Sequence, residues 1–141
     1  MVPQYKRNHL LVIDDSKGRR EFNLSSSVYS IGRDPKSDIR LFSQYVSRRH
    51  ATLVQLTDDY GTYYRLVDGN LKGKLSANGL RINGRKIQAH DLKDGDEIIF
   101  GPEVSARYYL LNQAETSPIY QDSETTLINF DMLDADEFDT L

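Results

Sequence analysis

The sequence predicts an all-β domain, and three observations lead to this fold class. Apolar residues in the first 113 positions occur in short runs that turn residues separate at close intervals, which is typical of a β-sandwich. No part of this region carries a long apolar stripe at the 3.6-residue helical period, so we expect helices to be short or absent. Dipeptides that favour tight hairpins, above all Asn83-Gly84, stand between neighbouring runs.

The individual elements follow from these runs and from the turns between them. We expect a turn over residues 14–19 built on Gly18, a hairpin at residues 58–61, and a second hairpin at Asn83-Gly84. The expected strands, in chain order, are 10–13, 21–24, 28–31, 51–56, 63–67, 80–82, 86–87, 97–100 and 107–111.

The charges divide the chain into two segments. The 141 residues have a formal net charge of −3. Residues 1–113 hold all 18 Lys and Arg and 13 of the acids, a balance of +5, whereas residues 114–141 hold the other 8 acids and carry −8. We therefore expect one domain over residues 1–113, large enough for a single core, and a flexible acidic tail over residues 114–141.

The tail has the composition of a segment that does not fold alone. Residues 121–126 are polar, and from Phe130 to Leu141 apolar residues alternate with acidic ones. Such alternation is typical of disordered segments that dock onto a partner. A tail that only solvates the chain is the alternative.

Composition also argues against several function classes. No apolar run approaches the roughly 18 residues of a membrane-spanning helix, and the N-terminus lacks the pattern of a secretory signal, so we expect a cytoplasmic protein with no membrane partner. The absence of cysteine excludes disulfides, thiolate zinc sites and a Cys nucleophile. The histidines (His9, His50 and His90) show no metal-ligand spacing, so no metal or other cofactor is expected. A nucleic-acid partner would fit the charge of residues 1–113, but an aromatic platform or basic helix is missing and we do not expect one.

The residues with suitable binding chemistry stand at the ends of predicted strands. Gly32-Arg33 ends one strand, Ser47-Arg48-Arg49-His50 precedes the next, and Ser76-Ala77-Asn78-Gly79 lies between two others. If the strands are antiparallel neighbours, these loops meet at one end of the sandwich. Together they offer a guanidinium, a hydroxyl and an amide, which suit a phosphate dianion. No nucleophile or general base stands among them, so we expect no enzyme activity.

These segments resemble the motifs of the forkhead-associated (FHA) family. The family's Gly-Arg, Ser-x-x-His and Asn-Gly motifs appear here in order, and Asn83-Gly84 and residues 92–101 continue the match. An ordered set of short motifs is far more specific than any one of them. The resemblance implies a β-sandwich of about eleven strands that binds phosphothreonine peptides through loops at one end.

The resemblance also assigns roles to residues of this chain. Arg33 and Ser47 would contact the phosphate, with Arg48 beside them, and Asn78 would hydrogen-bond the peptide backbone. The residues expected to support the loops are Gly32, His50, Ser76 and Gly79. Arg49 is expected to be solvated or structural, because alternation along an extended segment points it away from Arg48.

Two departures from the family pattern fall near this site. Many members have Thr where this chain has Ala77, which removes a hydroxyl that Ser76 could partly replace. The family usually has an Asp only a few residues before the Ser-x-Asn-Gly segment, whereas here Asp68 is followed by a longer loop containing Lys72 and Lys74. The two lysines either add positive potential to the site or are simply solvated, and of these we expect solvation.

The sequence therefore predicts a non-catalytic signalling adaptor whose partners are phosphothreonine-containing proteins. The alternative is a phosphate-independent regulator that binds metabolic enzymes or assembly partners through the same loops. The Glu-Thr-Thr run at positions 124–126 resembles the phosphorylated segment through which some bacterial family members close on themselves. Phosphorylation of Thr125 or Thr126 is therefore expected to make the tail a ligand, in cis or in trans.

Overall fold

A computed structural model describes residues 5–114 of the chain. The predicted tail with Thr125 and Thr126 lies outside them, apart from Ala114. The contacts within the chain define one compact unit over Arg7–Asn112. The described residues form strands and no helix, so they contain no helix that could cross a membrane.

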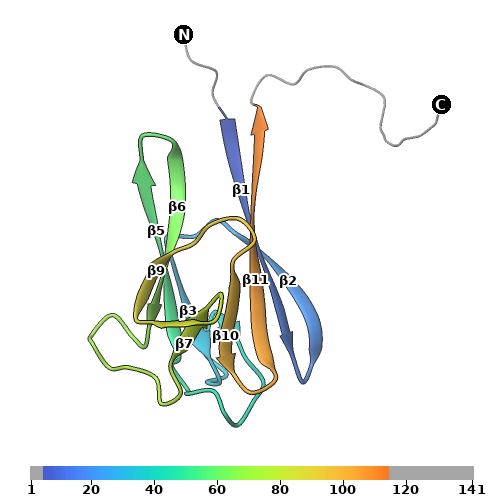
Figure 1. The fold of residues 1–141 in the computed structure, drawn as a ribbon, viewed down its shortest axis with the longest axis vertical. Helices are drawn as coiled ribbons and strands as arrows, with labels where there is room; N and C mark the ends of the chain where they lie inside the picture. Colours follow the sequence, from blue (N-terminus) through green and yellow to red (C-terminus); the bar gives the residue numbers. More distant parts are fainter. Residues whose placement is uncertain (1–4, 115–141) are drawn as a thin grey trace, which may run out of the picture. The chain divides into compact units, whose positions relative to one another are not determined.

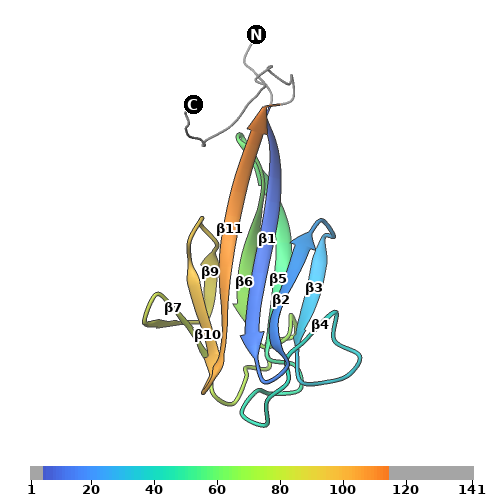
Figure 2. The ribbon, with the colours of Figure 1, turned by 90° about the vertical axis from the view of Figure 1, so that its right-hand side faces the viewer.

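Eleven strands make up the described part of the chain, which confirms the predicted fold class. In chain order they are β1 (Tyr5–Asp15), β2 (Gly18–Leu24), β3 (Val28–Gly32), β4 (Ile39–Arg40), β5 (Ala51–Asp58), β6 (Gly61–Asp68), β7 (Leu80–Ile82), β8 (Arg85–Ile87), β9 (Ala89–Asp91), β10 (Glu97–Gly101) and β11 (Val104–Ala114). A six-stranded sheet has the order β2-β1-β11-β10-β7-β8, and a five-stranded sheet has the order β4-β3-β5-β6-β9. Figures 1 and 2 show these sheets as two layers.

The two predicted hairpins form where the turn chemistry places them. β5 and β6 pair without interruption from Ala51 opposite Asp68 to Asp58 opposite Gly61. Asn83 and Gly84 join β7 to β8 with φ values of 51° and 85°. Positive φ at both central residues is the geometry of the type I′ turn, whose twist matches that of the flanking strands.

The structure differs from the prediction in several elements. The first turn comprises only residues 16 and 17, because Asp14 and Asp15 continue β1 and Gly18 already begins β2. The sequence pattern missed β4 and β9, which have only two and three residues. Runs this short carry no recognisable alternation, and β4 and β9 lack a hairpin signal such as the Asn83-Gly84 that marks the similarly short β7 and β8. β11 extends to Ala114, the first residue of the predicted tail.

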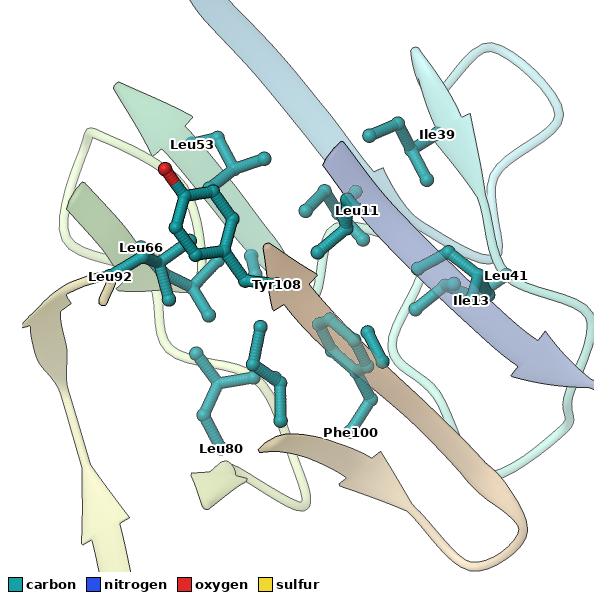
Figure 3. Packing of buried hydrophobic residues seen from close by; sticks show 14 of the residues in the cluster. Leu11, Ile13, Ile39, Leu41, Leu53, Leu66, Leu80, Leu92, Phe100 and Tyr108 are labelled. Atoms are coloured by element: carbon teal, nitrogen blue, oxygen red, sulfur yellow. The ribbon is translucent and has the colours of Figure 1, made fainter. Parts of the chain in front are cut away.

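The core lies between the inner faces of the two sheets (Figure 3). On β6 the buried Tyr64, Leu66 and Asp68 alternate with more exposed residues, as expected for a half-buried strand. Tyr64 and Tyr108 are the largest side chains that are fully buried. Burying each large apolar side chain contributes about 1.5–3 kcal/mol, and this packed core gives the loops at the strand ends a rigid base.

Candidate functional site

The three predicted loops lie at one end of the sandwich, at the lower end in Figure 1. The loops that follow β3 and precede β5 belong to the five-stranded sheet, whereas the loop before β7 reaches the six-stranded sheet. The site is therefore assembled across both sheets, and not only from antiparallel neighbours. A surface pocket of about 630 Å³ opens there. The residues that line it are Arg33, Asp34, Ser47, Arg48, Arg49, Asn70, Lys74, Leu75 and Ala77.

Gly32, the last residue of β3, lies against the backbone of the loop that precedes β5. A Cβ atom at this position would lie 2.1 Å from the carbonyl oxygen of Arg48, so a side chain does not fit. The close approach lets Arg33 donate its backbone N–H to the carbonyl of Ser47 at 3.1 Å. These contacts hold the β3 end and the Ser47 loop side by side.

The Arg33 side chain is anchored on one side only. Its Nε donates to the carbonyl of Val46 at 3.0 Å. The two terminal nitrogens of this guanidinium form no hydrogen bond to any residue in the described part of the chain. Because the guanidinium is planar and Nε fixes its orientation, these nitrogens form a fork that can bind two oxygens of one anion.

Ser47 offers a hydroxyl beside this guanidinium. Its Oγ accepts the backbone N–H of Ala77 at 2.9 Å. That bond uses an oxygen lone pair and leaves the hydroxyl proton for an anion in the pocket. It also joins the loop before β5 to the loop before β7.

His50 supports the loop before β5 and the loop before β7 from the interior of the domain. Its side chain is fully buried, its Nδ1 accepts the N–H of Ser47 at 3.0 Å, and its Nε2 lies 2.8 Å from the carbonyl oxygen of Gly79. A carbonyl can only accept, so Nε2 carries the proton and the imidazole is neutral. Burial lowers the pKa of His50, against smaller opposing contributions from the Gly79 hydrogen bond and from Asp68. Both ring nitrogens are occupied, which suits a structural role.

The loop before β7 presents Asn78 and is stabilised by its neighbours. The exposed Asn78 donates from Nδ2 to the carbonyl of Tyr45 at 2.5 Å. The hydroxyl of Ser76 accepts the N–H of Gly79 at 2.9 Å, and Gly79 has a φ of +78° that favours glycine. Neither Asn78 nor Ser76 is among the residues that line the pocket.

The longer loop after β6 leaves the position of Asp68 intact. The buried carboxylate of Asp68 accepts the N–H of Ser76 at 2.9 Å across the intervening residues. Gly69, with a φ of +77°, packs so closely that a Cβ would lie 1.8 Å from the carbonyl oxygen of Lys74. The additional residues therefore form a closed loop beside the site without separating Asp68 from Ser76.

Arg49 and Lys74 are exposed, as a solvated side chain would be, and they also line the pocket. Arg48 and Arg49 form a turn and not an extended strand, so alternation does not direct Arg49 away from the pocket. Lys74 also lines the pocket, whereas Lys72 lines a neighbouring one. The Arg48–Arg49 turn has no signal in the hydrophobic pattern. Asn70, whose Oδ1 accepts the N–H groups of two following residues, is a sequence signal for the closed loop, together with Gly69 and Gly73, which have positive φ values.

Charge in the pocket is predominantly positive. Among the described residues Asp34 is the one acid that lines it, and its pKa is lowered by a hydrogen bond from the Lys36 backbone and by the charges of Arg48 and Arg49. Arg48 reaches Asp34 at 3.4 Å. Within residues 5–114 no group of three or more His, Asp or Glu side chains is arranged to hold a metal ion. The arrangement can hold an anion by charge and hydrogen bonds.

Comparisons with known proteins agree with this geometry. The model of the FHA domain family matches residues 29–101. The crystal structure of the Slr1951 protein from Synechocystis sp. is 52% identical and has a TM-score of 0.68, over 72% of this chain and 96% of that one. A structure from an analysis of phosphothreonine-dependent FHA domain interactions is 30% identical and has a TM-score of 0.59, over 72% of this chain and 95% of that one.

A curated relative is much longer than this chain. The Synechocystis protein sll1895 is 34% identical over 99 residues, which make up 70% of this chain and 14% of the relative. The chain thus spans about one seventh of the length of the curated relative that it matches. The family match covers more than half of the chain. This chain belongs to the FHA domain family.

Proposed function

We propose that this domain binds phosphothreonine segments of partner proteins and acts as a non-catalytic adaptor. Arg33 and Ser47 hold the phosphate, Arg48 adds positive charge beside them, and Asn78 binds the backbone of the peptide. One observation carries this proposal. The Arg33 guanidinium is anchored through its Nε to the carbonyl of Val46, which leaves its two terminal nitrogens for a ligand. They lie in the same pocket as the Ser47 hydroxyl, whose proton is available to a ligand.

Two further observations support phosphothreonine binding without catalysis. A similar structure, 30% identical to this chain, comes from an analysis of phosphothreonine-dependent interactions. His50, which lies against the Ser47 loop, is buried. Both of its ring nitrogens are hydrogen-bonded, so it is unavailable as a general base. The domain holds a phosphate and does not transfer it.

Titration of a phosphothreonine peptide library against wild-type and Arg33→Ala protein tests the proposal. Arg33→Ala removes the main counter-charge of a dianion, which costs about 2–5 kcal/mol and so lowers affinity at least about 30-fold. Ser47→Ala removes a neutral donor and costs about 1 kcal/mol, or roughly fivefold. Arg85→Ala, at an exposed arginine on β8, is the matched control and should bind as wild type.

Two results would contradict the assignment. Equal binding of phosphorylated and unphosphorylated peptides would favour the phosphate-independent regulator. Unchanged affinity in Arg33→Ala, with Arg85→Ala also unchanged, would show that the phosphate lies elsewhere. Circular dichroism of each variant separates loss of binding from loss of fold.

The chain's own tail is a ligand candidate within the same proposal. The tail carries −8 and the preceding residues +5, and Thr125 follows Asn112 by 13 positions. A flexible segment of that length spans about 20 Å on average, whereas β11 runs from the pocket end of the sandwich to the opposite end (Figure 1), so closure in cis requires the tail to return along the sandwich. Phosphorylation of Thr125 or Thr126 then occupies the site in cis, or links two molecules in trans, and blocks other partners.

Chemical phosphorylation of the tail followed by NMR tests this regulation separately. The expected result is a shift of the Ser47 and Asn78 resonances, which Arg33→Ala abolishes. Light scattering distinguishes closure in cis from dimer formation. Unmoved loop resonances together with an unchanged mass would remove the tail as a ligand while leaving binding of other proteins untouched.

A further inference from the structure

The pocket carries more positive charge than a single phosphothreonine engages. In the described part of the chain, four basic side chains line it (Arg33, Arg48, Arg49 and Lys74) against the single acid Asp34. Arg48 already contacts Asp34. Arg33, anchored through its Nε, is the residue that binds the phosphate in the function proposed above. Neither Arg49 nor Lys74 forms an ion pair with an acid in residues 5–114. Two exposed cations in the pocket are therefore available to a ligand.

The loop that carries Lys74 is fixed by its own hydrogen bonds. Asn70 Oδ1 accepts the N–H groups of Lys72 at 2.9 Å and Lys74 at 3.1 Å, and the Asn70 N–H donates to the Lys74 carbonyl at 3.0 Å. The hydroxyl of the buried Thr52 donates to the carbonyl of Gly69 at 2.9 Å and ties the loop to β5. The backbone of Lys74 is thus positioned before any ligand arrives, which reduces the entropy lost on binding.

The space around these two cations is larger than one phosphate group requires. At about 630 Å³ the pocket lies within the range of about 300–1,000 Å³ that drug-sized ligands occupy. A second pocket of about 480 Å³ shares Arg49 and Asn70 with it and also includes Lys72. The surface thus continues from the Arg33 fork past Arg49 toward a further lysine.

We infer that, if the domain binds phosphothreonine as proposed above, its preferred ligands carry a second anionic group within two residues of the phosphothreonine. Arg49 and Lys74 hold that group, which is either the carboxylate of Asp or Glu or a second phosphate. Adjacent residues of an extended peptide are about 3.3 Å apart, so a neighbour within two positions stays beside the same pocket. Both kinds of group accept charge-assisted hydrogen bonds from these cations.

Matched phosphothreonine peptides test the inference by calorimetry. One series carries Gln, Glu or a second phosphothreonine at the two positions before the phosphothreonine, and the other series carries them at the two positions after it. In one series Glu should bind about threefold more tightly than Gln, the scale of one exposed ion pair. A second phosphate should gain about tenfold, because it carries nearly twice the charge.

Variants locate the subsite. In the Arg49→Ala/Lys74→Ala double variant the ratio of Glu to Gln affinity should fall to about one. Lys93→Ala removes an exposed lysine from the β9–β10 connection and should leave this ratio at about three. A gain with phosphate alone assigns the subsite to a second phosphate, and a gain with both groups assigns it to anions in general.

Failure of the inference is distinguishable from failure of the proposed function. Equal binding of Gln, Glu and doubly phosphorylated peptides by wild type would overturn the subsite while leaving phosphothreonine binding in place. So would a gain that survives in the double variant. If folded wild-type protein binds no phosphopeptide at all, the proposed function fails, and the inference fails with it.

Discussion

The buried imidazole of His50 donates a hydrogen bond from Nε2 to the carbonyl of Gly79 at 2.8 Å, across 29 positions of the chain. The same ring accepts the N–H of Ser47 through Nδ1. One side chain thus links the loop with the phosphate-binding serine to the loop with Asn78. The geometry of the proposed site depends on a residue that lies beneath it.

Replacing His50 with glutamine should destabilise the protein and weaken its binding. Glutamine can place an amide donor near the position of Nε2 but has no acceptor at the position of Nδ1, so the Ser47 N–H loses its partner, at a cost of about 1–3 kcal/mol. Chemical denaturation measures the loss of stability, and phosphopeptide titration well below the midpoint measures binding. A variant with wild-type affinity would show that the two loops hold their positions without the imidazole.

Stability should decline in mildly acidic solution because of the buried histidines. Burial lowers the pKa of His50 below its ordinary 6.5, and burial together with the charge of Arg7 lowers the pKa of His9. Below about pH 6.5 the unfolded chain therefore binds more protons than the folded one, and the free energy of unfolding falls as pH falls. Above that pH the contribution of the neutral rings is fully present.

The measurement is a series of denaturation curves between about pH 7.5 and about pH 5, the range in which histidine titrates. His50→Gln should show a shallower decline than wild type, because only His9 of the two buried histidines then remains. Identical slopes in the two proteins would mean that His50 does not titrate differently in the folded and unfolded states.

Gly32→Ala should distort the site from the β3 side. The added Cβ would lie 2.1 Å from the carbonyl oxygen of Arg48, so one of the two backbones must move, at a cost of about 1–3 kcal/mol. We expect lower stability and weaker phosphopeptide binding, measured by denaturation and titration.

Gly18→Ala, next to the turn between β1 and β2, is the comparison for this variant. No atom lies within 4 Å of the place that a Cβ at Gly18 would take, and only the φ of +94° opposes the substitution. Gly18→Ala should lose stability with little loss of affinity. Equal loss of affinity in both variants would argue against a specific role for Gly32.

Phosphothreonine should bind more tightly than phosphoserine. Leu75 and Ala77 line the pocket and supply apolar contacts for the threonine methyl group. A fully buried methyl contributes about 0.8 kcal/mol, which corresponds to roughly fourfold in affinity. Calorimetry with two peptides that differ only in this methyl group measures the ratio, and equal affinities would exclude such a niche.

The sequence by itself determined the local features of this protein. The turn chemistry of Asn83-Gly84 specified a hairpin that closes with two positive φ values, and the apolar runs located most of the strands. The ordered motifs also identified the loops that meet at the pocket, including Arg33 and Ser47. Each of these signals depends on neighbouring residues, which a sequence displays directly.

Only the tertiary structure decided which residues act together. β4 exists because Ile39 pairs with Ile31, and the longer loop keeps its place because Asp68 binds Ser76 across it. Arg49 and Lys74 join the pocket through a turn and a closed loop that the hydrophobic pattern does not mark. These relationships depend on hydrogen bonds and packing between segments separated in the chain, and local periodicity carries no information about such distances.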